Sequence, residues 1–134
     1  MVKANGIAGT LRTQVSNGEH SLLADAPVAK GGGGSGFGAH QLLEASFASC
    51  ICMAVRMHAS ADAIPLTSVE VDVTLSPPEN DGPVELGYSL TLFGPLSASQ
   101  RRTLEGAARE CPVRTTLSRG CSFAEKPHPA QARD

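Results

Sequence analysis

The sequence predicts an α+β fold built from antiparallel hairpins and helices. Three stretches of the 134-residue chain carry this prediction. Two runs within residues 66–92 alternate apolar and polar side chains around a Pro- and Gly-rich loop, which is typical of antiparallel strands with one buried face. A shorter alternation at residues 11–15 predicts a first hairpin. An apolar stretch over residues 39–61 has the length and periodicity of a helix.

The first hairpin is expected over residues 7–25. Residues 11–15 alternate in polarity, and Ser16-Asn17-Gly18 has the composition of a tight turn. The Gly-rich segment 30–38 contains the spacing of a dinucleotide-binding motif. However, no strand leads directly into it, and no acid follows where a ribose contact would need one. We interpret this segment as a flexible connector between sheet and helix.

The stretch from about residue 39 to 61 is predicted to form one long helix. Its apolar residues fall into two stripes at spacings of three and four: Leu43, Phe47, Cys50, Ala54 and Met57 in one, and Ala45, Ala48, Cys52, Val55 and Ala59 in the other. A helix that is apolar on more than one face must be covered on more than one face. At ~1.5 Å per residue it would be as long as a small domain is wide. We therefore expect a second subunit to cover it in a homodimer.

The second hairpin occupies residues 66–92, and a second helix follows it. Residues 97–100 match a capping box, which predicts the start of this helix. Pro112 ends the helix, because its ring would clash with the carbonyl group of Ala108. A short strand over residues 120–125 is expected to close a sheet.

Composition limits the classes of partner. The chain of 134 residues fits one domain, residues 1–134, with loose termini at about 1–8 and 126–134. Its net charge of -2 provides no positive patch for nucleic acid or for an anionic membrane. The longest apolar segment contains two charged residues and does not resemble a membrane span, and the first residues lack the apolar run of a signal peptide. We expect a cytoplasmic protein that binds neither nucleic acid nor membrane.

The four cysteines are unusual for a cytoplasmic chain, where thiols are normally reduced and are more often catalytic, metal-binding or inert than cross-linked. Cys50 and Cys52 are two residues apart on the predicted helix. Their side chains therefore point about 200° apart and cannot share one ion. Cys111 and Cys121 lack the short spacing of a zinc knuckle. We expect no metal site.

Cys50, Cys111 and Arg12 each admit two interpretations from local pattern. Cys50 is either a small apolar core residue or a redox thiol. If Pro112 begins a new helical turn, Cys111 is its N-cap, where backbone N–H groups and the helix dipole favour the thiolate. Otherwise Cys111 ends the buried face of the preceding helix. Arg12, in the first predicted strand, is either exposed or paired with an anion.

Four ordered blocks of the chain resemble the OsmC/Ohr family of thiol-dependent hydroperoxide-handling proteins. They are Gly18-Glu-His-Ser-Leu-Leu-Ala-Asp-Ala-Pro27, the Gly-rich segment, the stretch Gln41-Leu-Leu…Ala48-Ser-Cys50, and Cys111-Pro-Val-Arg-Thr-Thr-Leu117. The resemblance extends over about residues 9–125. It implies an OsmC-like α+β fold in which antiparallel sheets of two subunits intertwine around long central helices, with two active sites at the dimer interface.

The same resemblance implies roles for individual residues. Cys50 matches the peroxidatic cysteine, Cys111 matches the resolving cysteine, and Arg12 matches the helper arginine of the first hairpin. His40 stands where peroxidase members carry an acid, and Arg114 stands where a histidine is common.

The resulting hypothesis is a thiol-dependent peroxidase. Cys50 would attack an organic hydroperoxide and Cys111 would condense with the sulfenic acid to a disulfide. An external dithiol such as a lipoyl group would then reopen the disulfide, so no bound cofactor is needed. The expected substrate pocket consists of His40, Leu43, Phe47 and Met57.

Two alternatives use the same fold without rapid turnover. The first is a protein that holds a small apolar molecule in the interface pocket, which the missing acid at His40 motivates. The second is a redox sensor in which the disulfide changes contacts with a partner.

Overall fold

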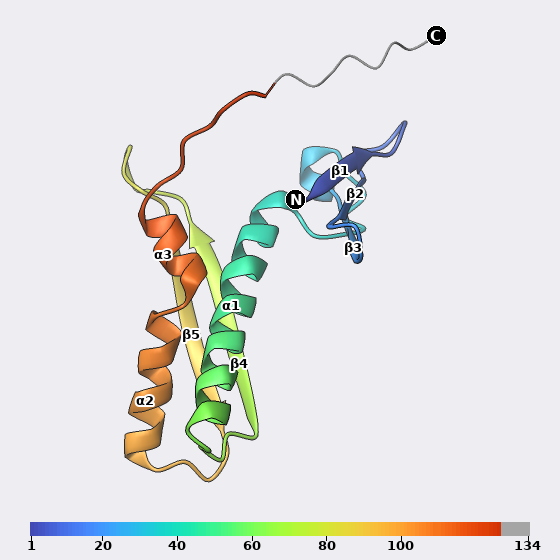
Figure 1. Cartoon of the computed structure of the whole chain (residues 1–134). Coiled ribbons are helices and arrows are strands. Elements are labelled where there is room, and N and C mark those ends of the chain that lie inside the picture. Colours follow the sequence, from blue (N-terminus) through green and yellow to red (C-terminus); the bar gives the residue numbers. More distant parts are fainter. Residues whose placement is uncertain (127–134) are drawn as a thin grey trace.

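The protein is described here by a computed structural model covering residues 1–126 (Figure 1). The elements are, in chain order, β1 (Lys3–Gly6), β2 (Thr13–Ser16), β3 (Ser21–Ala24), a 3-10 turn η1 (Val28–Lys30), α1 (Ala39–Ala61), β4 (Ser68–Ser76), β5 (Glu85–Phe93), α2 (Ala98–Arg109) and α3 (Pro112–Ser118). Figure 1 shows β1–β3 as a small sheet beyond the start of α1, whereas all three helices lie along the β4–β5 hairpin. The α+β prediction is confirmed. The intertwining of two subunits stays a prediction.

The N-terminal sheet corrects the expected loose start of the chain. Lys3–Gly6 pairs antiparallel with Thr13–Ser16, giving the order β1-β2-β3. All four residues of β1 are exposed, so backbone pairing alone holds the strand and no apolar alternation marks it in the sequence. The expected tight turn between β2 and β3 is present, and Asn17 Oδ1 accepts hydrogen bonds from the N–H groups of Glu19 and His20.

The Gly-rich segment is tethered, which corrects its interpretation as a flexible connector. The carboxylate of buried Asp25 accepts hydrogen bonds from the N–H groups of Ala26, Gly33 and Ser35 and from the Ser35 hydroxyl. These hydrogen bonds, led by those from Ser35, lower the pKa of Asp25. At Gly36 a Cβ atom would lie 2.3 Å from the Leu23 carbonyl oxygen, so only glycine permits this close approach.

The β4–β5 hairpin forms as predicted, with Val71 opposite Leu90 and Val73 opposite Tyr88. Burial alternates along β4, so one face of the hairpin packs on α1 and the other face is polar and exposed. The hairpin therefore forms one layer of the domain, and α1 covers its apolar face.

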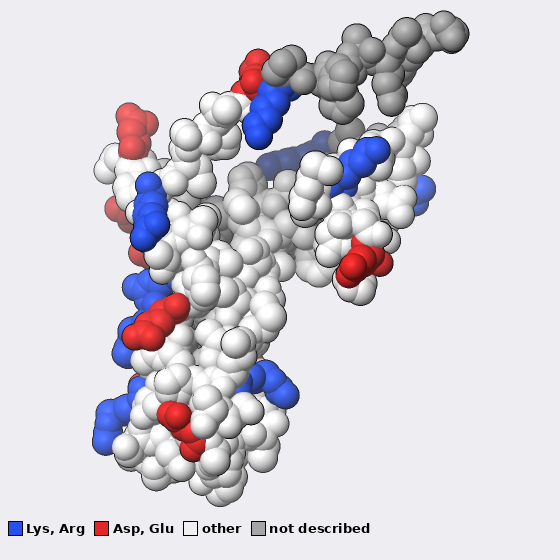
Figure 2. Space-filling model, in the orientation of Figure 1, with Lys and Arg blue, Asp and Glu red and all other residues white. Residues whose placement is uncertain are grey.

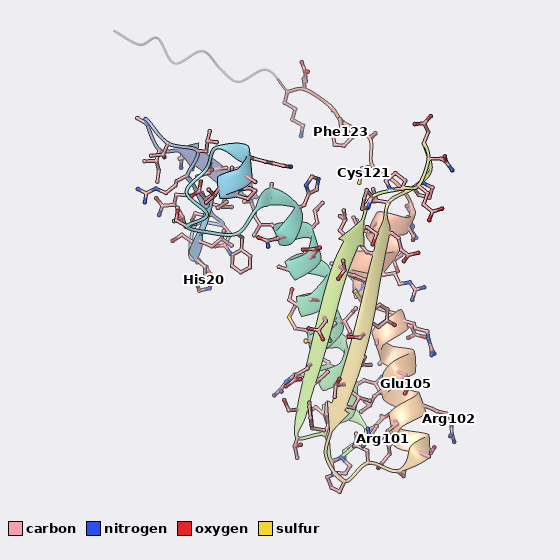
Figure 3. All side chains as sticks on the ribbon, turned by 180° about the vertical axis from the view of Figure 1, so that it is seen from behind. His20, Arg101, Arg102, Glu105, Cys121 and Phe123 are labelled. Atoms are coloured by element: carbon pink, nitrogen blue, oxygen red, sulfur yellow. The ribbon has the colours of Figure 1, made fainter. Side chains whose placement is uncertain are left out.

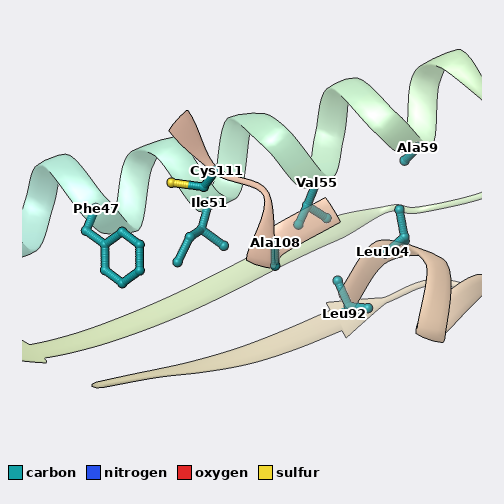
Figure 4. Close-up of a cluster of buried hydrophobic side chains, with 8 residues drawn as sticks. All are labelled: Phe47, Ile51, Val55, Ala59, Leu92, Leu104, Ala108 and Cys111. Carbon is teal, nitrogen blue, oxygen red and sulfur yellow. The ribbon is translucent and has the colours of Figure 1, made fainter. Parts of the chain in front are cut away.

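The buried face of α1 lies between the two predicted stripes. Phe47, Ile51, Val55 and Ala59 recur every four residues and face Leu92, Leu104, Ala108 and Cys111 (Figure 4). Contact with β4 and α2 buries this one row, which takes Phe47 from one predicted stripe and Val55 and Ala59 from the other. Apolar residues on the remaining faces stay exposed, among them Leu43, Met53 and Met57.

Figure 2 shows that the surface over α1 carries few charged side chains, while Lys, Arg, Asp and Glu gather at the margins of the molecule. By length and composition alone α1 could cross a membrane, a criterion that the core helix of a folded domain also satisfies. Its buried row packs against protein, which fits the second explanation.

The C-terminal part begins as predicted and ends differently. The Ser97 hydroxyl accepts a hydrogen bond from the Gln100 N–H group and thereby caps α2. Residues 121–126 form no strand, which corrects the expected strand over 120–125, since this segment pairs with no neighbour in the described chain. Of the expected loose tail, residues 127–134 lie outside the described residues.

Candidate active site

Cys50 and Cys111, 61 residues apart in sequence, meet within one chain. Cys50 lies on α1 and is partly buried, and Cys111 sits at the junction of α2 and α3 with 0% of its surface exposed. Burial raises the pKa of the Cys111 thiol, and hydrogen bonding and charge interaction with Cys50 raise this pKa further. Cys50 packs against the buried cluster that contains Cys111, so the two thiols lie in the same part of the core.

The local sequence explains the position of Cys111. Pro112 occupies the first turn of α3, and Cys111 is the N-cap residue of that helix, as one of the two interpretations expected. Cys111 also ends the buried face of α2 together with Leu104 and Ala108, as the other interpretation expected. The expectation that the N-cap position favours the thiolate is wrong, because the pKa of Cys111 is raised. The N–H groups of Arg114 and Val113 partly offset the rise in the Cys111 pKa, although neither completes a capping hydrogen bond to the sulfur. The break between α2 and α3 thus turns the sulfur towards α1.

Arg12 is not brought to the thiols within this chain. Its backbone belongs to the turn between β1 and β2, where the N–H group donates to Thr10 Oγ1 and the carbonyl accepts from Ile7. Strand β2 begins only at Thr13, so the placement of Arg12 inside a strand is wrong. The residue is exposed, and the sheet whose strands this turn connects stands apart from the helices (Figure 1).

A pocket of about 620 Å³ opens between α1, α3 and the start of β5, and we call it the α1–α3 pocket. Its walls are Leu43, Phe47, Leu75, Pro83, Val84, Leu86, Tyr88, Arg114, Leu117, Ser118, Gly120 and Cys121. Two of the four residues predicted for the substrate pocket, Leu43 and Phe47, belong to these walls. Neither Cys50 nor Cys111 lines this pocket. The wall residue Phe47 precedes Cys50 by about one helical turn, and α3 begins directly after Cys111.

Figure 4 shows the relation of the pocket wall to the sulfur of Cys111. The Cys111 side chain points towards the end of the cluster occupied by Phe47. The Phe47 ring also packs edge-on against Tyr88, with ring centroids 5.8 Å apart. Both rings of this aromatic pair line the pocket.

His40 and Met57 do not share the α1–α3 pocket, so the expected four-residue pocket is wrong for a single chain. His40, on the first turn of α1, lines a separate cavity of about 820 Å³ beside the Gly-rich segment. Met57 is 72% exposed and lines neither cavity, because it lies almost three turns beyond Phe47 on an outer face of α1.

Ten of the twelve wall residues lie outside the predicted pocket, among them Arg114, Tyr88 and Cys121. Arg114 belongs to the second cysteine motif, and this position was a usable signal. Tyr88 lies on the inward-facing side of β5, which the alternating pattern of this strand also indicates. Cys121 lies on the extended segment beyond α3 together with exposed Phe123 (Figure 3), and no local pattern predicts that it reaches this pocket.

Within residues 1–126, no group of three or more His, Cys, Asp or Glu side chains is arranged to hold a metal ion. Two adjacent thiols can pass between a dithiol and a disulfide.

Comparison with known proteins gives a consistent assignment. The family model described as OsmC-like protein matches residues 32–126. An organic hydroperoxide resistance protein OsmC from Legionella pneumophila is 29% identical, with a TM-score of 0.62 over 90% of this chain and 88% of the other. The organic hydroperoxide resistance protein OhrB of Bacillus subtilis is 27% identical, with a TM-score of 0.62 over 90% of both chains.

An OsmC-like protein from Mycoplasma pneumoniae shares the fold, with a TM-score of 0.73 at 20% identity over 88% of this chain and 86% of the other. No curated protein matches the sequence. The family model nevertheless spans most of the chain, including both cysteines of the candidate site. The chain therefore belongs to the OsmC family.

Proposed function

We propose that the protein is a thiol-dependent peroxidase that reduces organic hydroperoxides through Cys50 and Cys111. The observation that carries this proposal is the packing of Cys50 against the buried cluster that contains Cys111, within one chain. Membership of the OsmC family supports it, as does the likeness to organic hydroperoxide resistance proteins from Legionella pneumophila and Bacillus subtilis. A nearby pocket with mainly apolar walls suits an organic rather than an inorganic peroxide.

In the first step, the Cys50 thiolate attacks the distal oxygen of the hydroperoxide. The O–O bond breaks, the alkoxide takes up a proton and leaves as the alcohol, and Cys50 becomes a sulfenic acid. The sulfur is oxidised by two electrons and the peroxide is reduced by two.

In the second step, the Cys111 thiol condenses with the Cys50 sulfenic acid, and water leaves as the disulfide forms. An external dithiol, for which a lipoyl group is our candidate, then reduces the disulfide by two successive exchanges and is itself oxidised. No bound cofactor takes part in this cycle, and we place the protein in the cytoplasm, where such dithiols are kept reduced.

We further propose that the active form is a homodimer. The apolar residues left exposed on α1 require a cover, and the N-terminal sheet stands apart from the helices of its own chain. In such a dimer the first sheet of one subunit would bring Arg12 to Cys50 of the other. The guanidinium group would then favour the thiolate, a role that Arg12 does not perform within its own chain.

The test is consumption of cumene hydroperoxide with dihydrolipoamide as reductant. We expect turnover by the parent protein and by Cys52→Ser, and none by Cys50→Ser. After one equivalent of peroxide, mass mapping should find a Cys50–Cys111 disulfide. Turnover by Cys50→Ser at the parent rate would overturn the mechanism.

A binding protein with little turnover is the second candidate. His40 stands where peroxidase members of the family carry an acid, and it lies outside the α1–α3 pocket. The pocket itself is large enough for a small molecule. The assay above separates the two functions, since robust turnover with dihydrolipoamide removes the candidate that only binds.

A further inference from the structure

We propose that the outer surface of α2 and α3 docks an acidic protein through a set of exposed arginines. We call this surface the α2–α3 face and define it by Arg102, Arg109, Arg114 and Arg119. The inference rests on the proposed function in one respect, because it assigns to the acidic partner the dithiol that would reduce the Cys50–Cys111 disulfide.

Positive charge is concentrated in one short segment of the chain. Residues 97–120, which contain α2 and α3, hold five arginines and only two acids, Glu105 and Glu110, so the net charge of this segment is +3. Because the whole chain has a net charge of -2, the rest of it carries -5. The net charge alone therefore concealed a positive patch, and this patch creates a local positive potential.

The exposed arginines of α2 lie on the side of the helix that faces away from the core. Arg102 and Arg109 are seven residues apart, which places them on almost the same side of the helix, and both are exposed. Leu104 and Ala108 lie on the opposite side and are buried. Figure 3 shows Arg102 pointing outward from α2, and Figure 2 shows basic side chains along the margin that α2 and α3 occupy in Figure 1.

The arginines of the α2–α3 face are available to a partner. Arg101 is not counted among them, because it is partly buried and donates a hydrogen bond to the Leu92 carbonyl group, which ties α2 to β5. Within residues 1–126 no arginine of the face lies within salt-bridge distance of a carboxylate; the ion pair found there joins His58 and Asp62. A guanidinium group binds a carboxylate through two parallel hydrogen bonds, so this surface suits glutamates and aspartates of another protein.

The α2–α3 face surrounds the helix junction that holds Cys111. Arg109 comes two residues before this cysteine and Arg114 three residues after it. Cys111 is completely buried, and no residue of α3 is, so few buried side chains oppose the separation of α3 that would uncover the sulfur. A partner held on the face would already lie beside the junction when it opens.

The proposed reduction then follows ordinary thiol–disulfide exchange. One thiolate of the partner attacks the Cys50–Cys111 disulfide, which releases one cysteine as a thiol and leaves a mixed disulfide. The second thiol of the partner resolves the mixed disulfide. The protein gains two electrons and two protons, and the partner's dithiol becomes a disulfide.

An acidic protein fits this face better than nucleic acid does. The chain outside residues 97–120 is acidic, and it would repel a long polyanion that extends beyond the face. A folded protein can confine its negative charge to the area of contact. Complementary charges of this kind give specificity and speed the encounter more than they raise affinity.

The binding test uses two fluorescein-labelled peptides of equal length, one rich in glutamate and one with glutamine at the same positions. Fluorescence anisotropy follows their binding to reduced protein. We expect the parent to bind the glutamate peptide about tenfold more tightly at low salt, and we expect added NaCl to weaken this preference. Arg102→Gln combined with Arg109→Gln should remove most of it. Lys3→Gln combined with Lys30→Gln, an equal loss of exposed charge in the N-terminal part, should retain it.

The role in reduction is tested with unlabelled peptides of the same two kinds that also carry a pair of cysteines. They replace dihydrolipoamide as reductants in the cumene hydroperoxide assay. For the parent we expect a KM about tenfold lower with the glutamate dithiol than with the glutamine dithiol, and equal values for the double arginine variant. Dihydrolipoamide should support the same turnover in the parent and in both double variants, because it does not need the arginines.

Equal binding of the two labelled peptides by the parent, or a preference that persists in the double arginine variant, would overturn the inference. A single-stranded DNA oligonucleotide of matched charge that binds as tightly as the glutamate peptide would overturn the choice of an acidic protein. Binding without a lower KM for the glutamate dithiol would refute the partner's role as reductant. A protein that binds the glutamate peptide through Arg102 and Arg109 but consumes no cumene hydroperoxide would keep the docking face and refute the proposed catalysis.

Discussion

Cys111 is fully buried and lies beside a second thiol, and both conditions raise the pKa of its sulfur. A raised thiol pKa means that less thiolate is present at neutral pH, and the thiolate is the form that attacks. In the proposed cycle, the rate of condensation of Cys111 with the Cys50 sulfenic acid therefore depends on the small fraction of Cys111 that is ionised.

This leads to a prediction about pH. We expect the rate of disulfide formation to rise by about tenfold per pH unit between pH 7 and the raised pKa of Cys111. Rapid mixing of reduced protein with one equivalent of cumene hydroperoxide, followed by acid quenching and mass mapping at each pH, measures this rate. Cys111→Ser, which should stop at the sulfenic acid, is the control. A rate that does not change from pH 7 to pH 9 would contradict the prediction.

Phe47 has two functions, as a core residue and as a wall of the α1–α3 pocket. It is 4% exposed and packs against Tyr88. Truncation to alanine leaves a cavity, and we expect Phe47→Ala to lower the free energy of unfolding by about 3 kcal/mol. Urea denaturation measures the change. Phe123→Ala, at a residue 96% exposed, is the matched control and should change this free energy by less than about 0.5 kcal/mol.

At the scale of elements, the tethered Gly-rich segment joins the N-terminal sheet to α1. Asp25 holds the segment through hydrogen bonds that also lower the pKa of its carboxyl group. Because the folded pKa is the lower one, this contribution to stability is present above the unfolded pKa. It is lost as the pH falls through the folded value.

We expect Asp25→Asn to expose this segment. The N–H groups of Gly33 and Ser35 should exchange with solvent faster in the variant, because a neutral amide replaces the ionised acceptor. Hydrogen exchange followed by NMR measures the rates at neutral pH. Asp72→Asn, on the exposed face of β4, should leave both amides unchanged. Unchanged exchange in Asp25→Asn would show that the backbone holds the segment without the carboxylate.

Helix α1 carries its own prediction, because its outer apolar face has no cover within the described chain. A lysine introduced there would have to be desolvated in the proposed dimer. We expect Met57→Lys to raise the dimer dissociation constant by at least about tenfold. Sedimentation velocity over a range of protein concentrations measures this constant. Thr74→Lys, on the exposed face of β4, is the control, and equal sedimentation of the two variants would argue against an interface at Met57.

For the whole molecule, periodicity predicted the elements that bury a face. The long helix, the second hairpin and the cap at Ser97 all follow from side-chain spacing or capping chemistry, whereas the N-cap position of Cys111 is one of two interpretations that the sequence leaves open. Strand β1 escaped prediction because backbone pairing alone holds it, and this leaves no alternating pattern in the sequence.

Only some residues of the candidate site could be predicted from the sequence. The motifs indicated Cys50 and Cys111, and the apolar stripe indicated Leu43 and Phe47. Spacing along α1 could not decide which apolar row would face β4, and so Met57 was grouped with the pocket. The contributions of Arg114 and Cys121 depend on where α3 and the following segment lie in space.

Helix α3 begins directly after the buried Cys111, yet none of its own seven residues is fully buried. In the proposed cycle, a reductant too large to pass α3 would reach the Cys50–Cys111 disulfide only when this helix separates from α1, and few buried side chains oppose that movement. The peroxide would then oxidise Cys50 faster than the dithiol reduces the Cys50–Cys111 disulfide. When the peroxide concentration rises suddenly, the disulfide form of the protein would accumulate. The rate at which the dithiol reduces this disulfide would then limit how much peroxide is consumed.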